Sequence, residues 1–298
     1  MGTQTLGELI TGPGQVQYGD LLLGAGTSYR WRTLTGWEDL PDLDSSNAAR
    51  PDSHGAYPGA LLAQTRTVGL DGITIRAPRD QIGGAVAQFN AGTVPRLDEI
   101  PLVAWLDERG PLLVHARVLR RRVPTTVGYQ LGVISGAALQ WEATDPRRYG
   151  VDEQSADTGL PAPEPGLDWS GGGLSWADGL DWGLGGLTGN VGAVNSGDAE
   201  TSPVITFSGP VTMPRLTQED GRTIEYDITL AADDRLVVDT REGTVTLNGS
   251  ASRLYTATTR SVPEAAFTLA PGTTSLAFRA ETHSAAAHCT VQWRSAYW

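Results

Sequence analysis

The chain has 298 residues, a formal net charge of −12, a single cysteine, and 22 basic residues that are all arginine. This length allows two ordinary domains, and an apolar content of 40% with 9 tryptophans is enough to build a core, which argues against global disorder. The lone cysteine excludes an internal disulfide, and no apolar run reaches the roughly 18 residues that a membrane-spanning helix needs.

The charge is unevenly distributed, and its distribution suggests where the domains lie. Residues 1–150 contain 15 acids and 14 arginines, whereas residues 151–200 contain 9 acids and no base. A segment with so many like charges is expected to be solvated and extended. We therefore predict an N-terminal domain at 1–150, an acidic connector at 151–188 and a C-terminal domain at 189–298.

The first domain begins with strand-like runs at residues 15–23 and 28–34, separated by a glycine-containing turn. A long polar stretch follows, from Gly36 to about Gly59, and stretches of this length are usually functional or contact a partner. Oxygen-bearing side chains alternate within it, as in a calcium loop (Asp39, Asp42, Asp44 and Ser46). The bidentate glutamate of such a loop is missing, so a solvated loop is the favoured interpretation.

The pattern after this stretch predicts a hairpin and one helix. Apolar runs on either side of Asp71-Gly72 are typical of a β-hairpin with a tight turn. A helix is expected at Asp80–Asn90, with Asp80 as its cap and with Ile82, Val86 and Phe89 on one face. Strands then resume up to residue 150, so we predict an antiparallel domain with one helix. Three consecutive arginines, Arg120–Arg122, are the one basic cluster, which argues against tight nucleic-acid binding.

The connector repeats a short phrase that contains tryptophan: GLDW, GLSW and GLDW. Its three tryptophans are Trp169, Trp176 and Trp182, set among glycines that no helix would tolerate. A flexible linker is one interpretation. Exposed aromatic residues cost solubility, however, so we favour the alternative that these tryptophans dock against a groove on their own domain or on a neighbouring subunit.

The C-terminal domain shows the clearest strand pattern of the chain. In TIEYDITL, residues 223–230, apolar and polar positions alternate strictly, and Arg241-Glu242-Gly243 is flanked by strands as in a tight hairpin. About seven such strands with turns every 8–12 residues indicate a two-sheet β-sandwich. The fold class is therefore mainly β.

The search for chemistry predicts no enzyme, cofactor or metal site. No nucleophile elbow, phosphate loop or dinucleotide fingerprint is present. His283, His288 and Cys289 do not make a convincing metal site, because neighbouring residues of a strand point to opposite faces. Tyr297 and Trp298 are candidates for stacking on a glycan, which keeps a carbohydrate-binding adhesin as the alternative function. Trp293 alternates with Val291 and is expected in the core.

Several phrases in a fixed order resemble the distal tail protein of bacteriophages with long non-contractile tails, a siphovirus-type tail component, especially in phages of actinobacteria. In the first domain they are YRWRTLTGWEDLP, HGAYPG with RTVGLDG, and ATDPRRYG, which contains the candidate structural motif of Asp145, Pro146 and Tyr149. In the second they are SPVITFSGP, RLVVDTREGTVTLNG, LAPGTTSLAF and VQWRSAYW.

This resemblance implies a split-barrel N-terminal domain that assembles six subunits into a ring around a channel for DNA, and a galectin-like C-terminal β-sandwich. It implies a structural hub of the tail tip and baseplate, located in the virion and synthesised in the bacterial host cytoplasm. The implied partners are further copies of the chain, the tail tube protein, a tail-tip hub or tail-associated lysin, fibre or receptor-binding proteins, and the tape measure protein. No membrane and no specific nucleic-acid sequence is implied.

Overall fold

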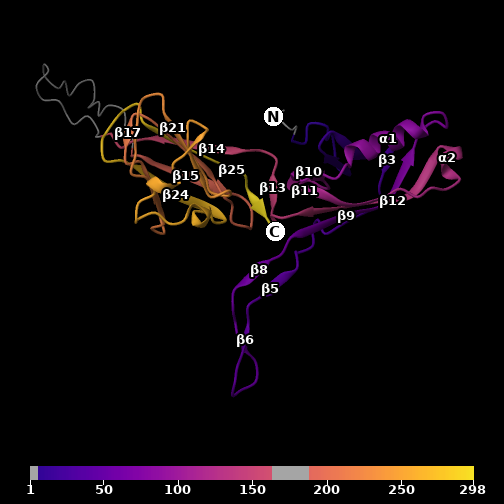
Figure 1. Ribbon diagram of the computed structural model, residues 1–298, viewed down its shortest axis with the longest axis horizontal. Helices are drawn as coiled ribbons and strands as arrows, with labels where there is room; N and C mark the ends of the chain where they lie inside the picture. The colour runs from indigo at the N-terminus through magenta and orange to yellow at the C-terminus, as the bar shows by residue number, and fades with distance from the viewer. Residues whose placement is uncertain (1–5, 163–187) are drawn as a thin grey trace, which may run out of the picture. The chain divides into compact units, whose positions relative to one another are not determined.

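The computed structural model describes residues 6–162 and 188–298, and in these the chain is mainly β (Figure 1). The described residues divide into two compact units. One contains the residues up to Val151 together with Tyr297–Trp298, and the other lies within Asp152–Ala296. No helix among the described residues has the length and hydrophobicity needed to cross a membrane.

One curved antiparallel sheet forms most of the first unit. Its strands follow the spatial order β2 (Leu21–Gly24), β1 (Gln15–Tyr18), β10 (Ile100–Trp105), β11 (Pro111–Arg122), β12 (Val133–Ala143), β9 (Arg66–Arg76) and β3 (Tyr29–Arg30), with β4 (Thr33–Thr35) beside β9 and β13 (Arg148–Gly150) beside β11. The strands at the two ends of this order, β2 and β3, are joined directly along the chain. The sheet is therefore nearly closed into a barrel.

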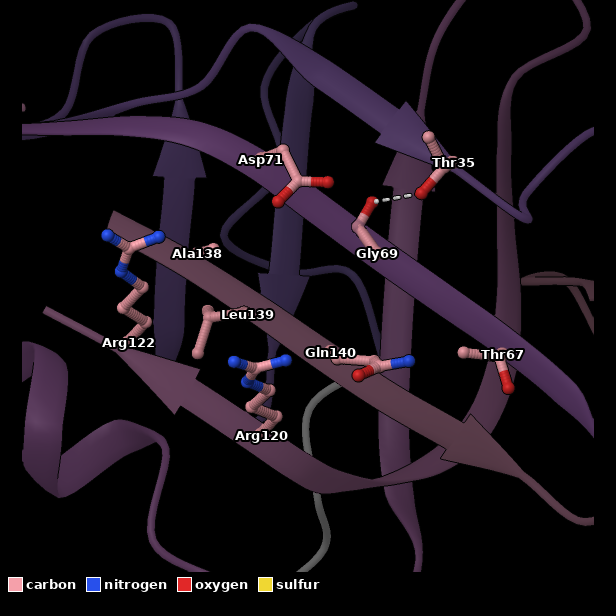
Figure 2. A pocket seen from close by; sticks show the side chains of 9 residues that line it. All are labelled: Thr35, Thr67, Gly69, Asp71, Arg120, Arg122, Ala138, Leu139 and Gln140. Carbon is pink, nitrogen blue, oxygen red and sulfur yellow. Dashed lines mark hydrogen bonds between the residues drawn. The ribbon is translucent and has the colours of Figure 1, made fainter. Parts of the chain in front are cut away.

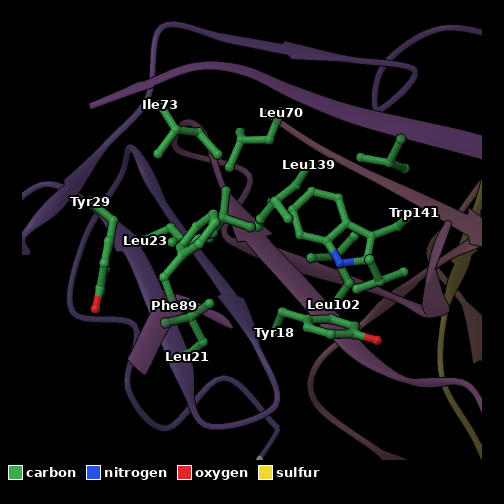
Figure 3. Close-up of a cluster of buried hydrophobic side chains, with 14 of the residues drawn as sticks. Tyr18, Leu21, Leu23, Tyr29, Leu70, Ile73, Phe89, Leu102, Leu139 and Trp141 are labelled. Carbon is green, nitrogen blue, oxygen red and sulfur yellow. The ribbon is translucent and has the colours of Figure 1, made fainter. Parts of the chain in front are cut away.

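The inner side of this sheet holds the core of the first unit (Figure 3). Tyr18 and Trp141 pack with ring centroids 5.7 Å apart, and the phenol of Tyr18 donates a hydrogen bond to the carbonyl of Ala116. Helix α1 (Ile82–Gly92) covers part of the core with Ile82, Val86 and Phe89. A shorter helix, α2 (Gly128–Leu131), precedes β12.

The helix prediction is confirmed in its position and buried face, but not in its cap. Residue Gln81 occupies the N-cap position, and no side chain caps the helix there. The helix begins two residues after Asp80 because residues 78–81 form a separate turn, closed by the amide of Gln81 and the carbonyl of Pro78.

The predicted hairpin at Asp71-Gly72 is wrong, because β9 runs without reversal from Arg66 to Arg76. Its register with β12 shifts between Leu70–Leu139 and Ile73–Ala137, so β9 has one more residue than its partner over this interval. This is a β-bulge, and Gly72 adopts its positive φ of 68°. The bulge lets Leu70 and Ile73 both face the core.

The second unit is a sandwich of two antiparallel sheets. The larger has the order β14 (Gln154–Gly159), β25 (His288–Trp293), β16 (Val204–Ser208), β21 (Arg235–Asp239), β22 (Thr244–Leu247) and β23 (Ala251–Ser252). The smaller has the order β15 (Asn190–Asn195), β24 (Gly272–Arg279), β18 (Arg215–Gln218) and β19 (Thr223–Glu225), and a short pair joins β17 (Val211–Thr212) to β20 (Thr229–Leu230). Two 3₁₀ turns, at Leu254–Thr256 and Glu264–Ala266, complete the unit.

Apolar side chains from both sheets meet between them, as the alternation predicts. Phe207 of β16 and Phe278 of β24 come from different sheets, and their ring centroids lie 5.8 Å apart. The predicted hairpin at residues 241–243 is confirmed by the pairing of Asp239 with Thr244. The galectin-like subtype of this sandwich stays a prediction.

Two ends of the second unit differ from the boundaries that composition suggested. Residues 154–159, placed in the acidic connector, form β14 and pair with β25. At the other end, β26 (Ala296–Tyr297) pairs with β13, and Tyr297 packs against the core of the first unit. Composition misplaces both ends because strand pairing between distant segments decides them.

Candidate functional site

The polar stretch after Gly36 forms a two-stranded arm, defined here as residues 42–64 (Figure 1). Strand β5 (Leu43–Ser45) pairs with β8 (Leu61–Ala63), and β6 (Ala48–Ala49) pairs with β7 (Ala56–Tyr57) further out. Every residue from 42 to 62 is exposed. The expected irregular loop is therefore a ribbon whose strands pair with each other alone among the described residues.

The two sides of the arm differ in character. Because directly paired residues share a side of a ribbon, Leu43 and Ala63 lie on one side together with Ser45 and Leu61. Asp44 and Leu62 lie on the other side. Asp42 lies on this second side too, because it is two residues before Asp44 and continues the pairing, with its carbonyl accepting a hydrogen bond from the amide of Gln64. The arm thus has an apolar side and an acidic side, and neither is covered.

A buried arginine holds the root of the arm in place. Arg66 is 1% exposed, and its Nη1 donates to the carbonyls of Gly36, Trp37 and Asp39 at 2.7, 3.0 and 2.8 Å. Its Nε donates to the carbonyl of Pro146 at 2.6 Å. Burial, and then the charge of Arg148, lower the pKa of Arg66 to about 10, so its guanidinium is charged at neutral pH. One side chain therefore ties the start of the arm to the end of β12.

Close backbone packing adds to this anchor. Gly36 has φ of +72°, and a Cβ at this position would lie 1.9 Å from the carbonyl oxygen of Thr67. Any other residue would push the chain away from β9. The arm therefore leaves the barrel along one defined path.

Charged side chains surround the same root. Glu38 Oε1 lies 2.8 Å from Nη1 of Arg148 and 3.1 Å from Nη2 of Arg109. Arg148 is 4% exposed and also donates to the carbonyl oxygen of Trp298. The final residue of the chain is thereby tied to the arginine cluster at the root.

The candidate structural motif lies beside this cluster. The hydroxyl of Tyr149 donates to Oδ2 of Asp145 at 2.6 Å, and Nε of Arg147 donates to Oδ1 at 2.9 Å. Pro146 supplies the carbonyl that Arg66 binds. Burial acts to raise the pKa of Asp145, but the hydrogen bonds from Arg147 and Tyr149 outweigh it and hold this pKa below its ordinary value of 3.8.

A substitution of Asp145 should change the acid stability of the protein. A depressed carboxyl pKa contributes stability above the unfolded-state pKa, and this contribution is lost as the pH falls through the folded-state value. We expect Asp145→Asn to lower the free energy of unfolding by about 1.5–3 kcal/mol at pH 7, the scale of a lost hydrogen bond to a charged group. Urea titrations at pH 7 and pH 3 should show the difference from the native chain shrinking at the lower pH. Asp98→Asn, at an exposed site, is the matched control, and an equal difference at both pH values would contradict the expectation.

A second feature is a shallow groove on the outer face of the barrel sheet (Figure 2). Its volume is about 310 Å³, and the side chains of Arg120, Arg122, Asp71 and Gln140 border it. Arg121, which lies between these two arginines in the sequence, does not border the groove. Arg121 donates to the carbonyls of Asn90 and Thr93 at the end of α1, at 2.8 and 3.2 Å, where it also complements the helix dipole.

Three more arginines were missed by sequence reasoning. Arg30, Arg32 and Arg76 border a neighbouring groove of about 590 Å³ on the first unit. None of them has a side-chain hydrogen bond or ion pair with another described residue. Arg30 and Arg32 are two residues apart, and residues at this spacing share one face of an extended segment. This spacing could have indicated that the two arginines lie on one surface.

The remaining predicted site residues are not brought into one site. Trp169, Trp176 and Trp182 lie outside the described residues. Tyr297 is partly buried against the core of the first unit, and Trp298 is 38% exposed. Trp293 is buried and donates from Nε1 to the carbonyl of Val194 at 2.9 Å.

No metal-binding cluster of histidine, cysteine or carboxylate side chains occurs in the described parts of the chain. Burial raises the pKa of the Cys289 thiol, which lies in the core of the second unit. The arrangement of Arg66, Glu38 and Arg148 positions a segment of backbone, and nothing in it resembles a nucleophile with its base.

Comparison with known proteins agrees with the resemblance found in the sequence. Residues 196–297 match the family model of the siphovirus-type tail component, C-terminal domain, the kind of protein that the phrases in the sequence resemble. No curated protein matches the chain in sequence.

Two solved structures share the fold. The Dit (gp 19.1) protein of phage SPP1, described as a paradigm of the hub adsorption apparatus in phages that infect Gram-positive bacteria, superposes with a TM-score of 0.62 at 13% identity, over 91% of this chain and 94% of the other. A chain of the phage P2 baseplate in its activated conformation with calcium superposes with a TM-score of 0.50 at 11% identity, over 93% and 97%. At these identities the likeness concerns the fold.

Proposed function

We propose that this chain is the structural hub of a phage tail tip, in which six copies form a ring that joins the tail tube to the tail-tip or baseplate and fibre proteins. The family match of residues 196–297 and the fold shared with SPP1 Dit support the hub role. In this role the chain acts by binding other proteins, without an enzymatic reaction, cofactor or metal, and it resides in the virion after synthesis in the bacterial host cytoplasm. The tube protein, a tail-associated lysin, receptor-binding proteins and the tape measure protein are the proposed partners.

The exposed arm is the observation that carries the ring. A two-stranded ribbon is marginally stable in water by itself, and this one exposes Leu43, Leu61 and Leu62 by 42, 61 and 64%. Contact with a neighbouring copy would cover these side chains and stabilise the ribbon. Because the arm and the surface that receives it are different parts of the chain, such contacts run head to tail and close into a ring when the rotation per copy fits.

The charge of the chain suits a channel for DNA. At a formal charge of −12 per copy, a ring repels phosphates, so that DNA can pass through its centre without adhering. This requires that the unpaired arginines of the first unit do not line the channel.

The adhesin alternative has less support from the described residues. Trp293 lies in the core and Tyr297 packs against the first unit, so neither presents a flat aromatic face to a sugar. Tyr255, which is 78% exposed, is the one strongly exposed aromatic residue among those described in the second unit.

Electron microscopy of the purified protein tests the proposal directly. We expect rings with sixfold symmetry and a central hole, either at high protein concentration or after addition of the tail tube protein as a template. Particles that stay monomeric under both conditions, or rings of another symmetry, would overturn the proposed hexamer. A glycan-binding screen would then be the next measurement.

A further inference from the structure

Five arginines form one basic face on the outer side of the barrel sheet: Arg30, Arg32, Arg76, Arg120 and Arg122. They border the two grooves described above, together with a single acidic residue, Asp71. All five are exposed, and their side chains have no hydrogen bond or ion pair with another described residue. This face is an exception on a chain that is acidic as a whole.

Strand register places these residues on the same side of the sheet. Arg120 pairs with Gln140 and Arg122 with Ala138, while their neighbours Leu139 and Trp141 point into the core. Arg30 pairs with Thr74, which alternates with the buried Ile73 and Ile75.

Arg32 connects the two grooves into one surface. A Cβ on Gly72 would lie 3.0–3.1 Å from the Cβ, Cγ and Cδ atoms of Arg32, so this side chain crosses β9 next to Asp71. Figure 2 shows Asp71 on β9 and Arg120 and Arg122 on β11, with β12 between these two strands. The five arginines therefore border adjoining grooves on the same side of the sheet.

Such a face favours an acidic partner. Like charges gathered on one surface repel each other, and a partner that brings carboxylates relieves this repulsion. Guanidinium groups also bind carboxylates in a planar, bidentate geometry, which adds specificity to the attraction.

The acidic side of the arm has the matching chemistry. Glu38 and Asp39 at the root already have partners, because Glu38 pairs with Arg109 and Arg148 and Asp39 accepts from the amide of Gly36. The side chains of Asp42 and Asp44 have none among the described residues. The arm adjoins the first residue of β9, Arg66, and extends from there away from the strands that carry the basic face of its own copy (Figure 1).

We propose that the acidic side of the arm of one copy, with Asp42 and Asp44, docks on the basic face of the next copy, at Arg120 and Arg122. This inference rests on the proposed ring and identifies the surface that closes it. Each copy offers one arm and one basic face, so the contact repeats around the ring. It also pairs Arg120 and Arg122 with carboxylates and so lowers the attraction of this face for DNA, which is why we favour a second copy over nucleic acid as the occupant.

Disulfide cross-linking between two variants, each with one added cysteine, tests the contact. Leu62→Cys lies on the acidic side of the arm, Gln140→Cys lies on the basic face next to Arg120, and the native Cys289 is buried. After mixing of differently tagged full-length variants and mild oxidation, we expect at least tenfold more Leu62→Cys/Gln140→Cys heterodimer than Leu62→Cys/Ser250→Cys heterodimer. Ser250 is exposed on a turn of the second unit and serves as the control. Equal yields of the two heterodimers would overturn the proposal.

Charge reversal tests the chemistry of the same contact. Adding Arg120→Glu and Arg122→Glu to the Gln140→Cys variant should reduce its cross-link at least tenfold, and adding Asp42→Arg and Asp44→Arg to its Leu62→Cys partner should restore it. The native cross-link should also weaken at high salt. An unchanged cross-link yield after the charge reversal would overturn the role assigned to the arginines.

Two outcomes separate this inference from the proposed function. Sixfold rings that persist in the Arg120→Glu, Arg122→Glu variant would overturn the docking surface and leave the ring intact. Tight binding of a short DNA duplex that this variant loses would assign the basic face to nucleic acid and overturn the proposal as well. Absence of rings from the native chain, with or without tube protein, would contradict the ring itself.

Discussion

Replacement of Arg66 by methionine is expected to lower the free energy of unfolding by about 3–5 kcal/mol. The methionine keeps much of the side-chain volume but leaves four carbonyl groups without their donor, those of Gly36, Trp37, Asp39 and Pro146. An acceptor left unsatisfied in a buried place costs about 1–3 kcal/mol, and such effects do not add fully. Urea unfolding of the full-length protein measures the change.

Two further variants make this result specific. Arg79→Met, at an exposed arginine without a side-chain partner among the described residues, should change the free energy of unfolding by about 0.5 kcal/mol or less. Arg66→Lys should fall close to Arg66→Met, since one ammonium group cannot reproduce the forked geometry of the guanidinium. If Arg66→Met and Arg79→Met unfolded alike, the anchor described here would not be what holds the root of the arm.

Removal of the arm is expected to abolish assembly and leave the fold nearly unchanged. Residues 43–63 can be replaced by Asn-Gly, which forms a tight two-residue turn between Asp42 and Gln64, already linked by a backbone hydrogen bond. Because residues 42–62 are exposed, the free energy of unfolding should change by about 1 kcal/mol or less. Ring formation, followed by light scattering and electron microscopy, should weaken at least 100-fold, which corresponds to about 2.7 kcal/mol per contact.

A control of unchanged length separates the reach of the arm from its chemistry. Serine at Leu43, Leu61, Asp42 and Asp44 keeps the ribbon but removes both of its distinctive sides, and this variant should assemble as poorly as the deletion. Rings that form without the arm would show that another surface of the first unit closes them. The deletion is preferable to a truncation after residue 188, because Tyr297 and Trp298 belong to the first unit.

The elements that were predicted well depend on neighbours in the sequence. Helix α1 follows from Ile82, Val86 and Phe89 at helical spacing, because residues three or four apart share a face whatever surrounds them. The alternation of Ile224, Tyr226 and Leu230 placed these side chains in the sandwich core for the same reason.

The errors arise where a local signal competes with distant pairing. Asp71-Gly72 is a strong turn signal, yet β9 continues through it because β12 on one side and β4 on the other supply hydrogen bonds along its length. The positive φ that Gly72 permits is used for a bulge instead of a reversal.

The sequence alone is enough to predict a mainly β protein with two domain-sized regions, and short phrases in both regions resemble a phage tail component. These properties follow from composition, from the alternation of apolar and polar residues and from short phrases, all of which can be read without knowing which distant segments pair. The tertiary structure decided that the polar stretch after Gly36 is an exposed arm, that Arg66 anchors it, and that Arg30, Arg32 and Arg76 share a face with Arg120 and Arg122. Each of these depends on strands far apart in the chain lying side by side, and the register of such pairs is chosen by the packing of the whole barrel.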